Sequence, residues 1–142
     1  MQKMIPILLF LGVVWTGCNL LDAADEAIVD VSGKVSDEGI AVEGAIVLLV
    51  ESAAISDGLN LANGSITNSR GNYRILKVDP GDYYVVAIED ENSNLEFDAD
   101  TDRLGFYGVN QSTNDLEPDR ITVEDEDRQN INITDLYSLS DK

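Results

Sequence analysis

From Ile28 onward, short apolar segments alternate with turn sequences roughly every ten residues, and this pattern constrains the fold most strongly. Val29, Val31 and Val35 alternate with polar residues, which is the pattern of a half-buried strand. Two segments are apolar on both faces and are predicted as central strands: Ala45–Val50 and Tyr83–Ile88. Further strands are predicted at Ser65–Asn68, Tyr73–Val78, Ile121–Val123 and Ile131–Leu139, and Leu104–Val109 is predicted as a strand or an ordered loop.

The residues between these segments have the composition of turns. Asp79-Pro80-Gly81-Asp82 places proline and glycine at the second and third positions of a type II turn. A hairpin-type turn is predicted at Ser69–Asn72, and another turn at Asp37–Gly39. Because no stretch has helical periodicity of useful length, residues 28–142 are predicted to form one all-β domain, a single antiparallel β-sandwich of about seven strands.

The first residues have the layout of a secretion signal. Lys3 precedes the apolar run Ile5–Val14, which is too short to span a bilayer as a helix. The sequence Trp15-Thr16-Gly17-Cys18 follows and resembles the bacterial lipoprotein signal, in which the chain is cleaved before the cysteine and the thiol is lipidated. Trp15 departs from that pattern, which has an aliphatic residue there. The alternative is an incidental thiol in an ordinary signal peptide. Residues 1–17 are predicted as the signal and Cys18 as the lipidated residue.

The resemblance implies a bacterial cell-envelope protein, held on the outer membrane or the cell surface by its lipid. Residues 18–27 are then a short polar tether. The formal net charge of the whole chain is −18, which repels nucleic acid and anionic lipid headgroups, so a nucleic-acid partner is excluded. The predicted contact with the membrane therefore depends on the lipid anchor.

An acidic loop follows the second central strand and suits a cation. Between Asp90 and Asp102 the oxygen-bearing side chains alternate in a pattern that turns them inward, and calcium takes six to eight oxygen ligands. The predicted calcium ligands are Asp90, Asn92, Asn94, Glu96, Asp98 and Asp102. The loop is not an EF-hand, because Leu95 stands where that motif has glycine and Thr101 where it has glutamate. The alternative is a solvated acidic turn without a metal.

Catalysis has no support in the sequence. The chain lacks histidine, which excludes Ser-His-Asp and Cys-His arrangements and makes zinc or copper sites improbable on chemical grounds. No carboxylate pair has the apolar surroundings that would raise a pKa for acid–base work. We therefore expect a non-enzymatic structural or binding module. Phe106 and Tyr107 are predicted as a surface for an envelope protein or a glycan, and the alternative function is a carbohydrate-binding module that uses Tyr84, Phe106 and Tyr107.

Four segments in order resemble a known family: Val31–Val35, Val42–Leu48, Thr67–Ile75 and Pro80–Tyr83. They are similar to the carboxypeptidase regulatory-like domain, a transthyretin-like sandwich with a Greek-key, immunoglobulin-like arrangement found in bacterial surface proteins. The likeness covers roughly Val29 to Ile88 and the strand near Ile131–Leu136. From Tyr83 onward the chain also resembles small secreted bacterial β-sandwich domains of unknown function. Both resemblances imply a fold and leave activity open.

Overall fold

The computed structural model describes residues 28–53 and 63–140, which are all-β apart from short 3₁₀ turns such as η2 (Gln111–Thr113). The predicted signal, Cys18 and the tether lie outside the described residues. No helix in the described part of the chain is long and apolar enough to cross a membrane. The strands are β1 (Val29–Lys34), β2 (Ser36–Asp37), β3 (Ile40–Ala41), β4 (Ile46–Val50), β5 (Gly64–Ile66), β6 (Asn72–Val78), β7 (Gly81–Glu89), β8 (Arg103–Phe106), β9 (Arg120–Val123) and β10 (Tyr137–Ser138).

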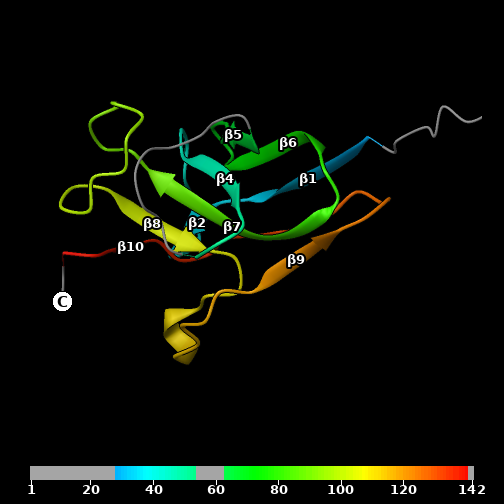
Figure 1. Ribbon diagram of the computed structural model, residues 1–142. Helices are drawn as coiled ribbons and strands as arrows, with labels where there is room; N and C mark the ends of the chain where they lie inside the picture. Colours follow the sequence, from blue (N-terminus) through cyan, green and yellow to red (C-terminus); the bar gives the residue numbers. More distant parts are fainter. Residues whose placement is uncertain (1–27, 54–62, 141–142) are drawn as a thin grey trace, which may run out of the picture.

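The larger sheet has the strand order β10-β8-β7-β4-β5 and is built around β7 (Figure 1). Along one edge β7 pairs antiparallel with β4, from Ile46 opposite Ile88 to Val50 opposite Tyr84. Along its other edge β7 pairs with β8 near its end and with β9 near its start. The prediction that Ala45–Val50 and Tyr83–Ile88 form central strands is therefore confirmed.

The second layer consists of β1, β6 and a C-terminal segment. β1 pairs antiparallel with β6, with Ser32 opposite Arg74. The other edge of β1 is covered by residues 128–136, which we call the strap. The Ser32 N–H donates to the Arg128 carbonyl at 2.8 Å, and the Ile133 N–H donates to the Lys34 carbonyl at 2.9 Å. The bridges between β1 and the strap are parallel.

The strap corrects one prediction. We expected a single strand over Ile131–Leu139, but only Tyr137–Ser138 forms a regular strand, antiparallel to β8. The residues before it cross from one layer to the other, because Ile131 and Ile133 are hydrogen-bonded to β1 whereas Tyr137 pairs with β8. The strap is thus a connection between the layers, with one end on β1 and the other on β8. The wider prediction of an all-β sandwich is confirmed.

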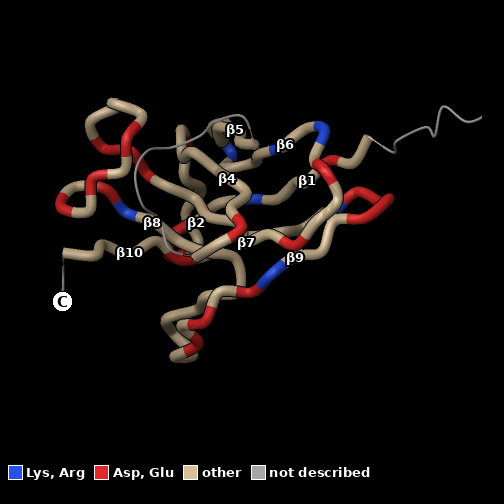
Figure 2. The backbone as a smooth tube through the Cα atoms, in the orientation of Figure 1, with Lys and Arg blue, Asp and Glu red and all other residues tan. Residues whose placement is uncertain are grey.

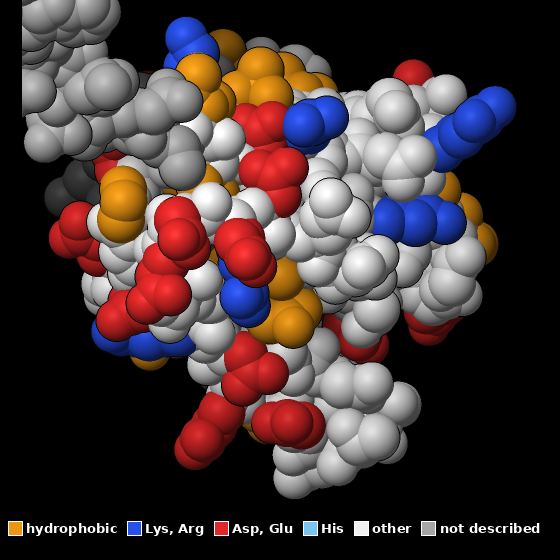
Figure 3. All heavy atoms as spheres, turned by 90° about the vertical axis from the view of Figure 1, so that its right-hand side faces the viewer, with side chains coloured by type: hydrophobic (Ala, Val, Ile, Leu, Met, Phe, Trp, Pro, Cys, Tyr) orange, Lys and Arg blue, Asp and Glu red, His pale blue; other side chains and the backbone are white. Residues whose placement is uncertain are grey.

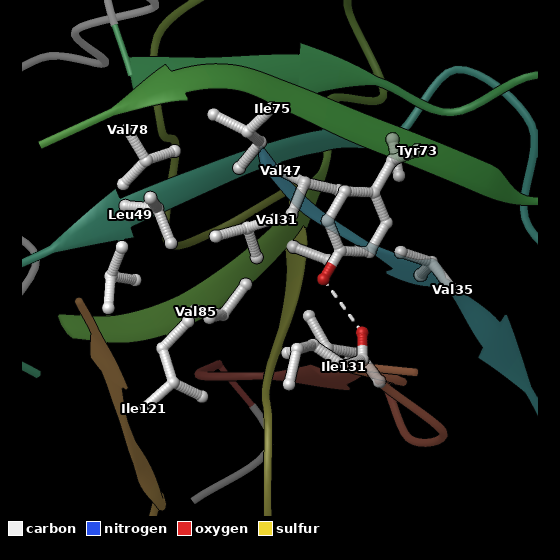
Figure 4. Packing of buried hydrophobic residues seen from close by; sticks show 14 of the residues in the cluster. Val31, Val35, Val47, Leu49, Tyr73, Ile75, Val78, Val85, Ile121 and Ile131 are labelled. Carbon is white, nitrogen blue, oxygen red and sulfur yellow. Dashed lines mark hydrogen bonds between the residues drawn. The ribbon is translucent and has the colours of Figure 1, made fainter. Parts of the chain in front are cut away.

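The main core lies between the two layers (Figure 4). Val31 and Val35 from β1 pack there with Val47 from β4 and Val85 from β7. Tyr73 crosses this core, and its hydroxyl donates to the carbonyl of Ile131 in the strap at 2.7 Å. Both layers and the strap therefore meet at one buried ring.

A second apolar cluster covers the outer face of the larger sheet. Because side chains alternate along a strand, the residues of β4 and β7 that do not face the main core point to this side. The buried members are Ile46, Leu48, Val86, Ile88, Leu104, Phe106 and Val109. Phe97 from the loop after β7 and Tyr137 from β10 pack against them. This arrangement explains why both central strands are apolar on both faces.

Candidate functional site

The acidic loop connects β7 to β8 at the left of Figure 1, and its base is held by Arg103. Arg103 lies opposite Glu89 in the register of the two strands. Its guanidinium contacts Glu89 and Asp37 at 2.5 Å each, so one cation joins the loop base to the β2–β3 hairpin. Figure 2 shows the concentration of Asp and Glu in this loop beyond that cation.

The first half of the loop is folded by side-chain oxygens that accept backbone N–H groups. Asp90 accepts from Leu95 at 2.8 Å and from Asn94 at 3.3 Å. Asn92 Oδ1 accepts from the Asn94 N–H at 3.0 Å, and Asn94 Oδ1 accepts from the Glu96 N–H at 2.8 Å. Ser93 and Leu95 take left-handed backbone angles, with φ of 58° and 61°, which turns the alternate side chains to the inside.

Asp98 and Asp102 close the second half of the loop. Asp98 Oδ2 accepts from the amide nitrogens of Asn92 and Asn94 at 2.8 and 2.9 Å. Asp102 is fully buried, and its carboxylate accepts from the Asp98 N–H at 2.8 Å and from the Glu91 N–H at 3.2 Å. Phe97, next to Asp98, packs on the outer apolar cluster and attaches the loop to the sheet.

Five of the six predicted ligands therefore belong to one hydrogen-bonded network: Asp90, Asn92, Asn94, Asp98 and Asp102. The sixth, Glu96, contributes its backbone N–H, while its side chain is exposed. In this network the negative charge of the Asp98 carboxylate is stabilised by hydrogen bonds from the side-chain amides of Asn92 and Asn94.

The network has the donor set of a calcium site but a different orientation of the amides. Carboxylates and amide oxygens are suitable ligands for calcium. Here the NH₂ groups of Asn92 and Asn94 point at Asp98, so a cation would have to replace both of them. Within residues 28–53 and 63–140, no three Asp, Glu, His or Cys side chains are grouped so that they could hold a metal ion.

The predicted aromatic surface is not formed. Phe106 is only 5% exposed, because it pairs with Val86 and points into the outer apolar cluster, so its prediction as a surface residue is wrong. Tyr107 is half-buried against the main core. Tyr84 is also half-buried, and the Arg120 guanidinium lies 4.7 Å from its ring centre. The exposed pair of aromatics that a carbohydrate-binding module needs is absent from these predicted residues.

Two features of the site region were not predicted. Arg103 follows the acidic loop in the sequence, but its contact with Asp37 joins residues far apart in the chain and has no sequence signal. A pocket of about 560 Å³ lies beside the β8–β10 edge, lined by Arg103, Val109, Gln111, Leu116, Leu136, Tyr137 and Ser138. These residues come from three segments that are separate in the sequence, so no local motif indicates the pocket.

No family model matches the sequence, and no curated protein matches it. Two solved structures are similar over 78% of the chain. One is a type II cohesin–X–dockerin complex from Acetivibrio cellulolyticus, with 15% identity and a TM-score of 0.41. The other is a DUF3823 family protein from Parabacteroides merdae, with 14% identity and a TM-score of 0.40. The chain spans 58% and 46% of the length of these chains.

Proposed function

We propose that this protein is a non-enzymatic structural or binding module of the bacterial cell envelope, anchored by a lipid on Cys18. The layout of residues 1–18 supports the anchor, and the β-sandwich supports a relationship to the carboxypeptidase regulatory-like domain. The absence of histidine from the chain supports a role without acid–base or nucleophilic catalysis of the histidine-dependent kinds.

We further propose that calcium orders the acidic loop. The observation that carries this proposal is the network in which the amides of Asn92 and Asn94 meet at Asp98, while Asp90 accepts from the backbone of the same turn. If the two amides turn their oxygens inward, the ion gains four side-chain oxygens and neutralises carboxylates that otherwise repel each other. Phe97 would then transmit the order of the loop to the outer face of the sheet, where an envelope partner binds.

Thermal unfolding of residues 18–142, first with excess calcium and then with a chelator, tests the metal. An ion that binds only the folded state raises stability by about 2.7 kcal/mol at a hundredfold excess over its Kd, which moves the melting temperature by several degrees. Asp98→Asn should abolish the shift. Asp100→Asn removes the same charge from an exposed residue outside the network and should retain the shift. A wild-type melting temperature that is equal in calcium and chelator would overturn the calcium proposal.

The anchor has a separate test. Cells that express the full chain should incorporate labelled palmitate into the protein, and Cys18→Ser should abolish both the label and the recovery of the protein with the membrane fraction. Because Cys18 is the only cysteine, no other thiol can account for the label. A wild-type protein that stays unlabelled would reject the lipid anchor and leave the calcium proposal unaffected.

A further inference from the structure

The cations of the described residues are gathered on one layer of the sandwich. Only Arg103 and Arg120 lie on the larger sheet. The others lie in or next to β1, β6 and the strap: Lys34, Arg70, Arg74, Lys77 and Arg128. β1, β6 and the strap also contain the carboxylates Asp30 and Asp135, so cations are in local excess on this layer although the chain has a net charge of −18. In Figure 3 several Lys and Arg side chains lie along the top and right-hand side of the molecule, with some Asp and Glu side chains beside them, and most Asp and Glu side chains lie to the left and below.

These cations point to solvent. Along β1 and β6 the core-facing residues Val31, Tyr73 and Ile75 alternate with exposed ones, so Lys34 and Arg74 project from the outward face. Arg74 pairs with Asp30 at 2.6 Å and lowers the pKa of that carboxyl. Among the described residues, no salt bridge connects Lys34, Lys77 or Arg128 to a carboxylate. We call the outward surface that carries Lys34, Arg70, Arg74, Lys77 and Arg128 the cationic face.

A shallow hollow of about 440 Å³ lies in the cationic face. The described residues that line it include no carboxylate: Ser32, Gly33, Lys34, Asn72, Tyr73, Gln129, Asn130 and Asn132. The Oδ1 atom of Asn132 already accepts from the Lys34 N–H at 3.0 Å, which leaves its NH₂ group as a donor. Lysine and side-chain amides together can donate to phosphate and hydroxyl oxygens.

The N-terminal segment enters the sandwich at this same layer. Ile28 precedes β1 and is 70% exposed, and Leu76 on β6 is 61% exposed. The acidic loop lies at the opposite end of the molecule from Ile28 (Figure 2). A tether of ten residues spans at most about 35 Å, so an anchor at Cys18 keeps Ile28, at the start of the layer that carries the cationic face, within that distance of the bilayer.

We propose that the cationic face is a docking surface for anionic phospholipid headgroups, whose phosphate and hydroxyl groups enter the hollow. This inference rests on the proposed anchor for the approach to the membrane. Beyond a Debye length of about 8 Å salt screens the charges of the protein and the bilayer, so the face is attracted only when the tether holds it within that distance. At that range the cations of the face lie nearer to the headgroups than the carboxylates on the rest of the molecule. The acidic turn Glu124–Asp127 borders the face where the strap begins, so the contact centres on the hollow.

Chemical coupling of Cys18 to a maleimide lipid allows a test that does not depend on lipidation in cells. Residues 18–142 contain every contact of the described sandwich and one thiol, so they can be attached to vesicles of phosphatidylcholine with or without phosphatidylglycerol. Acetylation of lysines is then followed by mass spectrometry. Lys34 and Lys77 should react several-fold more slowly on the anionic vesicles, and high salt should remove this protection. Lys142 serves as the internal reference.

A pair of arginine variants separates docking from general charge effects. Arg128→Gln removes a cation from the face and should reduce the protection of Lys34 by up to about fivefold, the effect of one cation near a membrane surface. Arg120→Gln makes the same change on the larger sheet and should leave the protection intact. Equal rates on both vesicle types would overturn the inference. Protection that is independent of lipid charge and grows with protein density would also overturn it, in favour of contact with a second copy.

The outcomes remain distinguishable from those of the anchor experiment. Protection on coupled vesicles without palmitate labelling in cells would retain the docking face and reject the natural anchor. Palmitate labelling without protection would retain the anchor and reject the face.

Discussion

The carbonyl oxygen of Ile131 occupies the space where a β-carbon on residue 33 would lie. Gly33 therefore allows the strap to pass directly beneath β1 and to receive the Tyr73 hydroxyl on the same carbonyl. Gly105 on β8 stands in the same relation to the carbonyl of Asp135, further along the strap. The strap crosses each layer at a position where a strand has no side chain.

Gly33→Ala should destabilise the fold. The new methyl collides with backbone that is fixed by hydrogen bonds to both sides, so we expect a loss of about 2–3 kcal/mol in the free energy of unfolding, measured by urea denaturation. Ser32→Ala, one residue earlier and on the outward side of β1, should change it by less than about 0.5 kcal/mol. An unchanged midpoint for Gly33→Ala would show that the strap can move away from β1.

Tyr73→Phe should weaken the attachment of the strap to the core. The variant leaves the Ile131 carbonyl buried without its donor, which costs about 1–2 kcal/mol. Amide hydrogen exchange should quicken at Ile131 and Ile133 more than in the centre of β7. Equal changes in both places would mean that the bond supports the whole sandwich and not the strap in particular.

Alkaline pH should destabilise the wild type through Tyr73. Burial, followed by the nearby Tyr107, raises the pKa of this phenol above its usual value of 10.0, so the unfolded chain loses the proton at a lower pH than the folded chain. The stabilisation is complete below pH 10 and decreases as the pH rises through the interval between the two pKa values. Urea midpoints measured across that interval should fall less steeply for Tyr73→Phe than for the wild type, and parallel slopes would contradict this assignment.

Thr67→Val should be costly despite its similar size. The buried hydroxyl accepts from the Ala45 N–H at 2.8 Å and donates to the Val42 carbonyl at 2.7 Å. Valine leaves both backbone groups without a partner, so we expect a loss of about 2–4 kcal/mol in the free energy of unfolding. Thr122→Val is the matched control, because that hydroxyl bonds to Asp82 on the exposed surface and should contribute less than about 1 kcal/mol.

Asp102→Asn should loosen the acidic loop even when calcium is absent. A carboxylate accepts from both the Asp98 and Glu91 N–H groups, whereas an amide presents an NH₂ group to one of them. The melting temperature in chelator should fall by an amount equivalent to about 1–3 kcal/mol. Asp100→Asn should leave it nearly unchanged. If Asp102→Asn lowers stability only when calcium is present, Asp102 is a metal ligand and not a closure of the loop.

The sequence was sufficient to predict the strands whose hydrophobic pattern is local. β4 and β7 are apolar on both faces because each separates two apolar clusters, and that pattern is visible without a structure. The same pattern contained a clue to Phe106. A sheet with two apolar faces is buried on both of them. An aromatic side chain on the neighbouring strand β8 points to one of these two faces and is therefore expected to be buried.

The features that were not predicted, the pairing of the strap and the orientation of the loop amides, depend on three-dimensional contacts. The parallel pairing of the strap with β1 depends on the space left by Gly33, and a glycine in a strand has several possible reasons. In the acidic loop, Glu96 is the one of the six predicted ligands whose side chain lies outside the hydrogen-bonded network. The spacing could not indicate that Asn92 and Asn94 present their nitrogens to Asp98, because the two ends of an amide are equivalent in a sequence pattern.

The strap also determines when the sandwich can complete its fold during synthesis. The hydrogen bonds that fix β1 and β2 to residues 127–136 join residues 97, 98 and 99 positions apart. β1 is made long before the strap, so its second edge stays without a partner while the chain between them is synthesised. A chain that is threaded N-terminus first through a narrow channel therefore emerges with an open sandwich, and the arrival of the strap closes it.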